Sequence, residues 1–200
     1  MKIKICGINR SVDVQYINAS QPDYVGFIVN FPKSHRSVTY EQLDSLSGQV
    51  DAAVKKVGVF VDESPEKIAQ VLNEGTLDIA QLHGRQDEDF VHRLRSLTDK
   101  EIWKAFSIEN EEDLRQAEAS SADLVLLDNK GGGTGQVFDH SLIQDFQRPY
   151  LLAGGMDEET IPLALEEYAP FGIDTSSGTE TDKKKDPEKI ENIIRMVQND

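Results

Sequence analysis

Short apolar runs alternate with longer amphipathic segments along the whole of this 200-residue chain. The runs are rich in Val, Ile, Leu and Phe, which is typical of strands buried on both faces of a parallel sheet. Repetition of strand and helix about eight times predicts a (βα)8 barrel, and an open doubly wound sheet, which usually has fewer strands, is the alternative. The expected strands are Lys2–Ile8, Tyr24–Val29, Val54–Val61, Ile79–His83, Ile102–Ser107, Leu124–Asp128, Tyr150–Ala153 and Gly172–Thr175.

The segments between these strands carry signals for helix starts and ends. Ser64 followed by Pro65 predicts an N-cap and a first helical residue, and Gly75 is expected to end that helix. Asp186 and Pro187 predict the start of the last helix in the same way. Because no charge block, proline-rich linker or shift in composition divides the chain, we expect one α/β domain over residues 1–200, a TIM barrel with short loops.

Charge and composition restrict the possible partners. The formal net charge of −15 disfavours nucleic acid, because affinity for a phosphate backbone comes from Lys and Arg, and it disfavours an anionic membrane surface. Backbone N–H groups can still hold a small phosphorylated substrate. With one cysteine, no secretory signal after Met1 and no membrane-length apolar run, we expect a cytoplasmic protein without a disulfide or a metal cluster.

Polar residues follow the expected strands at the end where barrel enzymes have their active sites. Cys6 lies at the end of the first strand and Asp128 ends the sixth, so both side chains are expected at one mouth of a closed barrel. A thiol and a carboxylate facing each other there provide a base and an acid for moving protons on a small molecule. A lone cysteine is also often a small buried hydrophobic residue, and Asp128 could instead cap a helix.

Glycine-rich stretches follow the sixth, seventh and eighth expected strands. Glycine lets the backbone approach a ligand closely, and successive N–H groups form an anion-binding nest. Phosphate sites in (βα)8 barrels typically use the loops after strands seven and eight, so a phosphate site is expected here, with flexible turns as the alternative. The candidate residues are Gly133, Gly135, Gly154, Gly155, Ser176, Ser177 and Gly178.

A series of short motifs carries a family resemblance. Each motif is weak alone, but their order and spacing are highly specific, and they extend from residue 4 to about residue 186. The motifs are Lys4–Gly7, Val25–Phe27, Lys33–Arg36, Val57–Phe60, Gln81–Gly84, Leu126–Asp128, Gly133–Gly135, Phe138–Asp139, Leu152–Gly155 and Asp174–Gly178. Together they resemble the phosphoribosylanthranilate isomerase family of tryptophan biosynthesis.

The resemblance implies a (βα)8 barrel and an aldose–ketose isomerase that needs no cofactor or metal. The implied reaction is an Amadori rearrangement of N-(5'-phosphoribosyl)anthranilate to 1-(2-carboxyphenylamino)-1-deoxyribulose 5-phosphate. By the family motifs, Asp128 is the general acid and Cys6 the general base. Arg36 is placed to meet the anthranilate carboxylate, where a guanidinium makes a bidentate contact, and Asp174 to bond sugar hydroxyls or assist proton transfer. Arg36 could instead be a solvated loop residue, and His83 is as compatible with a structural role as with the pocket wall.

The chain departs from the family pattern at two positions. The family commonly has an aromatic residue after the loop arginine, where this chain has Ser37, and Trp after Phe-Asp, where it has His140. The first change is expected to loosen the grip on the anthranilate ring, and the second to affect packing. The lysine-rich stretch Asp182–Asp186 is expected to be a solvated loop rather than a binding patch.

Two other functions remain open from the residues. One is a related phosphosugar isomerase, such as the histidine-pathway enzyme, but that enzyme typically uses two aspartates, and Cys6 counts against it. The other is a catalytically inactive barrel that only binds a phosphorylated ligand, which would keep affinity without turnover. The oligomeric state, monomer or homodimer, is not indicated by the sequence.

Overall fold

The computed structural model describes residues 1–128, 143 and 146–198. All eight expected strands are present in it, which confirms the predicted strand pattern. They are β1 (Lys2–Cys6), β2 (Tyr24–Val29), β4 (Lys55–Phe60), β5 (Ile79–Leu82), β6 (Glu101–Ser107), β7 (Leu124–Asp128), β8 (Tyr150–Ala153) and β9 (Gly172–Thr175).

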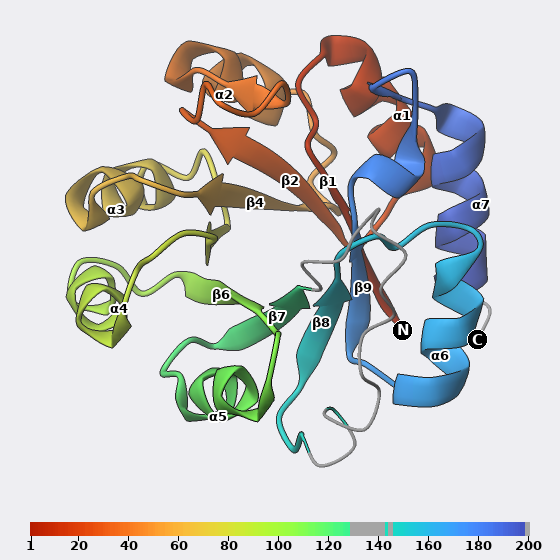
Figure 1. The fold of residues 1–200 in the computed structure, drawn as a ribbon. Coiled ribbons are helices and arrows are strands. Elements are labelled where there is room, and N and C mark those ends of the chain that lie inside the picture. The colour runs from red at the N-terminus through yellow and green to blue at the C-terminus, as the bar shows by residue number, and fades with distance from the viewer. Residues whose placement is uncertain (129–142, 144–145, 199–200) are drawn as a thin grey trace.

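These strands form a closed parallel ring. Their order is β1-β9-β8-β7-β6-β5-β4-β2, and β1 also pairs with β2, so the sheet has no open end between its first and last members. The strands lie at the centre of the molecule, and the helices surround them (Figure 1). The (βα)8 barrel is therefore confirmed, and the open doubly wound sheet is excluded.

Helices connect the strands on the outside of the ring. Those in the described residues are α1 (Ser11–Ser20), α2 (Tyr40–Ser47), α3 (Pro65–Asn73), α4 (Glu88–Arg95), α5 (Glu111–Ala119), α6 (Thr160–Tyr168) and α7 (Pro187–Gln198).

The predicted helix signals act as expected in α3 and α7. The side chain of Ser64 accepts a hydrogen bond from the amide of Lys67, and Pro65 occupies the first turn of α3. Gly75 has a φ of +81° just beyond the end of that helix. At α7, the carboxylate of Asp186 accepts hydrogen bonds from the amides of Glu188 and Lys189. Side chains therefore satisfy amides that the first helical turn leaves without a helical partner.

Alternate residues of each strand face opposite sides of the barrel wall. The outward side chains, such as Ile3, Ile5 and Leu127, pack with the helices in one large core. A smaller apolar cluster is formed by inward positions of the strands. Its members are Val57, Ile79, Trp103, Leu124, Leu126 and Leu151.

The inward-facing positions become polar towards the carboxyl ends of the strands. Cys6 follows two residues after Lys4 on β1, Gln81 two residues after Ile79 on β5, and Asp128 two residues after Leu126 on β7. The period of two thus sends each of them to the same face as the residue before it. The apolar cluster fills the barrel interior, and the polar residues lie between it and the carboxyl ends of the strands.

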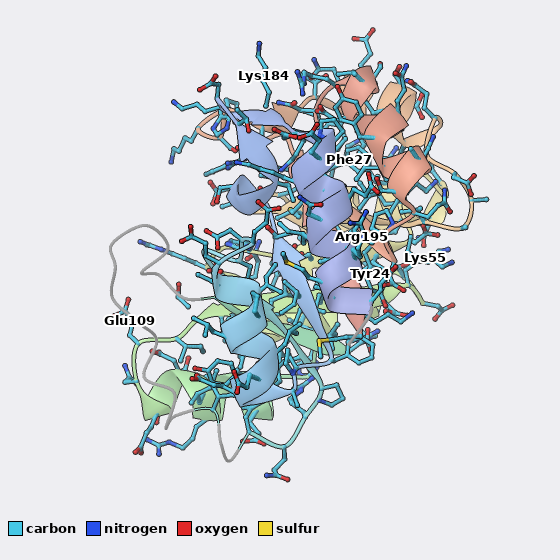
Figure 2. All side chains as sticks on the ribbon, turned by 90° about the vertical axis from the view of Figure 1, so that its right-hand side faces the viewer. Tyr24, Phe27, Lys55, Glu109, Lys184 and Arg195 are labelled. Carbon is cyan, nitrogen blue, oxygen red and sulfur yellow. The ribbon has the colours of Figure 1, made fainter. Side chains whose placement is uncertain are left out.

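Three short strands were not expected from the sequence. β3 (Ser37–Val38) pairs with the end of β2, and β10 (Glu180–Thr181) forms an antiparallel hairpin with β11 (Lys184–Lys185). The prediction of a solvated loop over Asp182–Asp186 was therefore wrong in part. Lys184 is exposed and points away from the ribbon in Figure 2, whereas Lys185 is buried. Alternation along a strand separates the two neighbouring lysines in this way.

Candidate active site

A cavity of about 330 Å³ opens at the carboxyl ends of the strands. The structure brings most of the predicted site residues into its lining: Cys6, Arg36, His83, Asp128, Gly154, Gly155, Asp174, Ser176 and Ser177. Gly178 lies next to this lining rather than in it, and Gly133 and Gly135 lie outside the described residues, as does His140. The thiol and the carboxylate predicted at one mouth of the barrel thus line one cavity.

Cys6 is buried beside a lysine at the bottom of the cavity. The side chain of Lys4 has no exposed surface, and its Nζ lies 2.8 Å from Oδ1 of Asp174. Burial raises the pKa of the Cys6 thiol, the Lys4 ammonium opposes that rise, and the carboxylate of Asp174 adds to it, so that the thiol pKa is raised overall. Burial acts against the charge on Lys4, but Asp174 and Cys6 outweigh it and raise the Lys4 pKa.

Asp128, at the end of β7, faces His83, which directly follows β5. Oδ2 of Asp128 lies 3.4 Å from Nε2 of His83. Burial raises the pKa of the Asp128 carboxyl, His83 lowers it and Asp174 raises it, leaving the pKa above its ordinary value. A carboxyl group with a raised pKa keeps its proton to higher pH, which is what a general acid needs near neutrality.

Gln81 supports His83 from below. Its Nε2 lies 3.3 Å from Nδ1 of His83, on the side of the ring away from Asp128. Oε1 of Gln81 is buried in the cavity wall and has no hydrogen-bond partner among the described residues. Buried acceptors are normally satisfied, so this atom is suited to a hydroxyl group of a ligand.

Arg36 reaches the cavity from the loop after β2 and is held by a carboxylate. Its Nε and Nη2 donate to the two carboxylate oxygens of Glu180, at 2.6 and 2.7 Å. Glu180 also accepts from Nζ of Lys185 at 3.0 Å, and its side chain is only 7% exposed. Burial would raise the pKa of Glu180, but Arg36 and Lys185 outweigh it and lower the pKa to about 2. Arg36 is thus an oriented residue rather than a solvated one, and the guanidinium has further N–H groups besides the two that Glu180 occupies.

The loops after β8 and β9 are joined where the phosphate was expected. Oγ1 of Thr175 donates to the carbonyl of Met156 at 2.6 Å. A Cβ at Gly178 would lie 2.1 Å from the same carbonyl oxygen, so only glycine allows the loops to approach so closely. Gly154 and Gly155 have φ values of +85° and +68°, the left-handed region that glycine adopts most readily.

Three residues of the site were missed by sequence reasoning: Lys4, Glu180 and Lys185. Lys4 had a usable signal, because it precedes Cys6 by two residues and must share its face of the strand. Glu180 and Lys185 had none, because they reach the site through a hairpin of two-residue strands.

In residues 1–128, 143 and 146–198, no group of three or more His, Cys, Asp or Glu side chains could hold a metal ion. No helix of this described part is long and apolar enough to cross a membrane.

The chain has the architecture of a (βα)8-barrel enzyme. The barrel is closed, and ionisable groups and glycine loops surround one cavity at the carboxyl ends of its strands. The family model for N-(5'phosphoribosyl)anthranilate (PRA) isomerase matches residues 3–196. The N-(5'-phosphoribosyl)anthranilate isomerase of Clostridium acetobutylicum is 37% identical over 205 residues, covering 98% of each chain. The chain therefore belongs to the N-(5'-phosphoribosyl)anthranilate isomerase family, and the resemblance in its sequence motifs is confirmed.

Solved structures agree in fold over the whole chain. The phosphoribosyl anthranilate isomerase of Thermotoga maritima has 35% sequence identity and a TM-score of 0.89, covering 100% of this chain and 99% of that one. A phosphoribosyl anthranilate isomerase in complex with reduced 1-(o-carboxyphenylamino)-1-deoxyribulose 5-phosphate has 33% identity and a TM-score of 0.86, with the same coverage.

Proposed function

We propose that this chain catalyses the Amadori rearrangement of N-(5'-phosphoribosyl)anthranilate to 1-(2-carboxyphenylamino)-1-deoxyribulose 5-phosphate, a step of tryptophan biosynthesis. The observation that carries the proposal is that Cys6 and Asp128 line one cavity with the glycine loops, in a chain that matches the isomerase family over residues 3–196. This arrangement supplies a base, an acid and a phosphate site around one small molecule.

The two proton transfers are assigned to these two groups. Asp128, as the protonated carboxyl, gives its proton to the ring oxygen of the ribose, and the furanose opens to a Schiff base. Cys6, as the thiolate, removes the proton from the second sugar carbon, so that the enol forms and the iminium nitrogen accepts the electron pair. The first sugar carbon then gains a proton as the enol becomes the ketone. One acid and one base suffice, since the substrate supplies the electrons.

The remaining lining residues orient the substrate. Arg36 meets the carboxylate of the anthranilate, and Phe31 lines the same part of the cavity with an aromatic ring. Ser37, which replaces the usual aromatic residue, accepts a hydrogen bond from the amide of Phe31 at 2.8 Å. This contact ties the two ends of the loop that carries Arg36.

The sugar and its phosphate occupy the rest of the cavity. Asp174 and Gln81 offer oxygen atoms to the sugar hydroxyls, while His83 holds Asp128 in position. The phosphate lies on the backbone of the two joined loops, at Gly154–Gly155 and Ser176–Gly178. The family motifs assign Gly133 and Gly135 to the phosphate as well, and both lie outside the described residues.

The setting of the reaction is proposed from composition. Residues 1–200 act as one domain in the cytoplasm, as a monomer or homodimer, on a small molecule rather than nucleic acid. The net charge of −15 and the single cysteine support this setting.

The test is the loss of anthranilate-type fluorescence when the protein is added to freshly generated phosphoribosylanthranilate. We expect rapid decay with the unaltered chain and a decay about 10²- to 10⁴-fold slower with Asp128→Asn, because that is the usual contribution of a general acid. Asp89→Asn is the matched control, since Asp89 is exposed on α4. Ligand binding without decay would refute the isomerase and favour an inactive binding barrel. Conversion of the histidine-pathway substrate alone would favour the related isomerase.

A further inference from the structure

Lys4 carries a charge in a place where an isolated charge is costly. Its side chain is fully buried inside the barrel, and burying an ammonium group costs several kcal/mol unless other groups compensate. Asp174 provides one partner, at 2.8 Å. An ion pair that serves only stability could be replaced by apolar residues at little cost. A role for the charge of Lys4 is therefore sought in its other neighbour, the thiol of Cys6.

The thiol of Cys6 lies against the same lysine. β1 and β2 place Gly26 opposite Cys6 in the parallel register. A Cβ at Gly26 would lie 2.7 Å from Sγ of Cys6 and 3.1 Å from Nζ of Lys4, so both groups lie against this glycine, where they interact electrostatically with each other. A side chain at position 26 would occupy the space that the two groups share.

The other charged groups around Cys6 come from β9, the loop after β2, and the β10–β11 hairpin. Asp174 raises the pKa of the thiol, and Lys185 lowers it, as Lys4 does. Arg36 also interacts electrostatically with Cys6, but both Arg36 and Lys185 are held by Glu180. Lys4 is therefore the cation that lies directly at the sulfur and has Cys6 as its second partner.

We propose that Lys4 is a positioning residue that stabilises the thiolate of Cys6 and fixes its direction, while Asp174 balances the charge of Lys4 when Cys6 is protonated. The proposal rests on the assignment of Cys6 as the base. In the thiolate state the ammonium lies between two anions, Sγ and Oδ1 of Asp174. When the thiolate takes the proton from the substrate carbon, the ammonium–carboxylate pair remains neutral, so no charge is left unpaired.

The single cysteine makes a direct test possible. Thiolate absorbs near 240 nm, and subtraction of the Cys6→Ser spectrum leaves the titration of Cys6 alone, without substrate or turnover. In Lys4→Met, which keeps the length of the side chain without its charge, we expect the thiol pKa to rise by about one to two pH units. The thiolate fraction at a fixed pH below the pKa then falls about 10- to 100-fold. Lys55→Met is the control, because Lys55 is exposed at the amino end of β4, away from the cavity at the carboxyl ends of the strands.

Two further variants separate charge from structure. Lys4→Met leaves Asp174 without its cation, so the double variant Lys4→Met/Asp174→Asn, which buries no unpaired charge, is measured as well and should keep the raised thiol pKa. Asp174→Asn alone removes an anion near the sulfur, so its thiol pKa should fall. A merely structural role for Lys4 would not shift the two single variants in opposite directions.

The outcomes are distinct from failure of the proposed function. A thiol pKa unchanged in Lys4→Met and in the double variant would overturn the role of Lys4, whatever the activity. A rise in both variants supports it, even if the chain acts on another substrate. If the chain is the isomerase, kcat/KM rises with pH as Cys6 loses its proton. In the double variant this rising limb should move to higher pH by the same amount as the thiol pKa. Movement of the thiol pKa without movement of this limb would overturn Cys6 as the base and not the electrostatic contact.

Discussion

Replacing Glu180 by glutamine removes the carboxylate that joins Arg36 to Lys185. The unaltered carboxylate is 7% exposed and accepts hydrogen bonds from both residues. Its two cationic partners lower its pKa from 4.5 to about 2 against the effect of burial. Glutamine keeps the size of the side chain, so the substitution isolates the charge.

The magnitude follows from the pKa. Each pH unit of displacement corresponds to about 1.4 kcal/mol, so the displacement of Glu180 sets an upper limit of roughly 3 kcal/mol on its contribution to the free energy of unfolding. The side chain of Arg36 is 20% exposed, so solvent screens part of its attraction to Glu180 and the loss falls below that limit. We therefore expect Glu180→Gln to lose roughly 2 kcal/mol at pH 7.

The pH dependence has a definite sign. The folded pKa of Glu180 is depressed, so its stabilisation is present in full above the unfolded value of about 4.5 and is lost as the pH falls towards 2. The difference in unfolding free energy between the two proteins should be constant from pH 8 to about pH 5 and should shrink below that.

Urea unfolding followed by the fluorescence of Trp103 measures this difference. Trp103 is the single tryptophan and is buried inside the barrel. Glu191→Gln on α7 is the matched control, because Glu191 is 66% exposed in its pair with Arg195 and such pairs contribute about 0.5 kcal/mol or less. Equal losses in the two variants, or a difference that does not shrink in acid, would refute the reasoning.

Three further predictions concern the cavity. Gly178→Ala should lower the melting temperature and the affinity for phosphate, because its Cβ would lie 2.1 Å from the carbonyl oxygen of Met156. Gly48→Ala is the control, since its Cβ would lie no closer than 3.4 Å to any neighbour, and it should change neither quantity in a thermal melt or a phosphate titration. Arg36→Ala should mainly raise the Michaelis constant, and an unchanged constant in steady-state kinetics would remove Arg36 from the substrate site. Inorganic phosphate should compete with the substrate, and no competition at high concentration would count against the glycine-loop site.

The barrel was predictable because buried strands and capped helices leave local signals. Runs such as Leu124–Asp128 are too short for a helix and too apolar for a loop, and Ser64-Pro65 marks a helix start by its own chemistry. The placement of Cys6 and Asp128 at one mouth follows from closure of the ring, since the carboxyl ends of parallel strands lie together.

The charged interior was not predictable in the same way. A lysine is normally exposed, and nothing local tells Lys185 from the exposed Lys184. For Lys4, the period of two places the side chain on the same strand face as Cys6, but it does not predict that a charged group is buried there. Each is buried with a carboxylate partner: Lys4 with Asp174, 170 residues away, and Lys185 with Glu180 across the β10–β11 hairpin. The first pair depends on a contact between distant segments, and the second on a hairpin of two-residue strands, and neither leaves a signal in composition or periodicity.

The central claim is that Cys6 and Asp128 act on one substrate from within the same cavity. A crystal structure of this protein with a reduced, unreactive analogue of the aminodeoxyribulose phosphate product tests it most directly. We predict that the first two sugar carbons lie between Sγ of Cys6 and the carboxyl of Asp128, with the phosphate on Gly154–Gly155 and Ser176–Gly178. A ligand bound with its reacting carbons out of reach of either group would contradict the account.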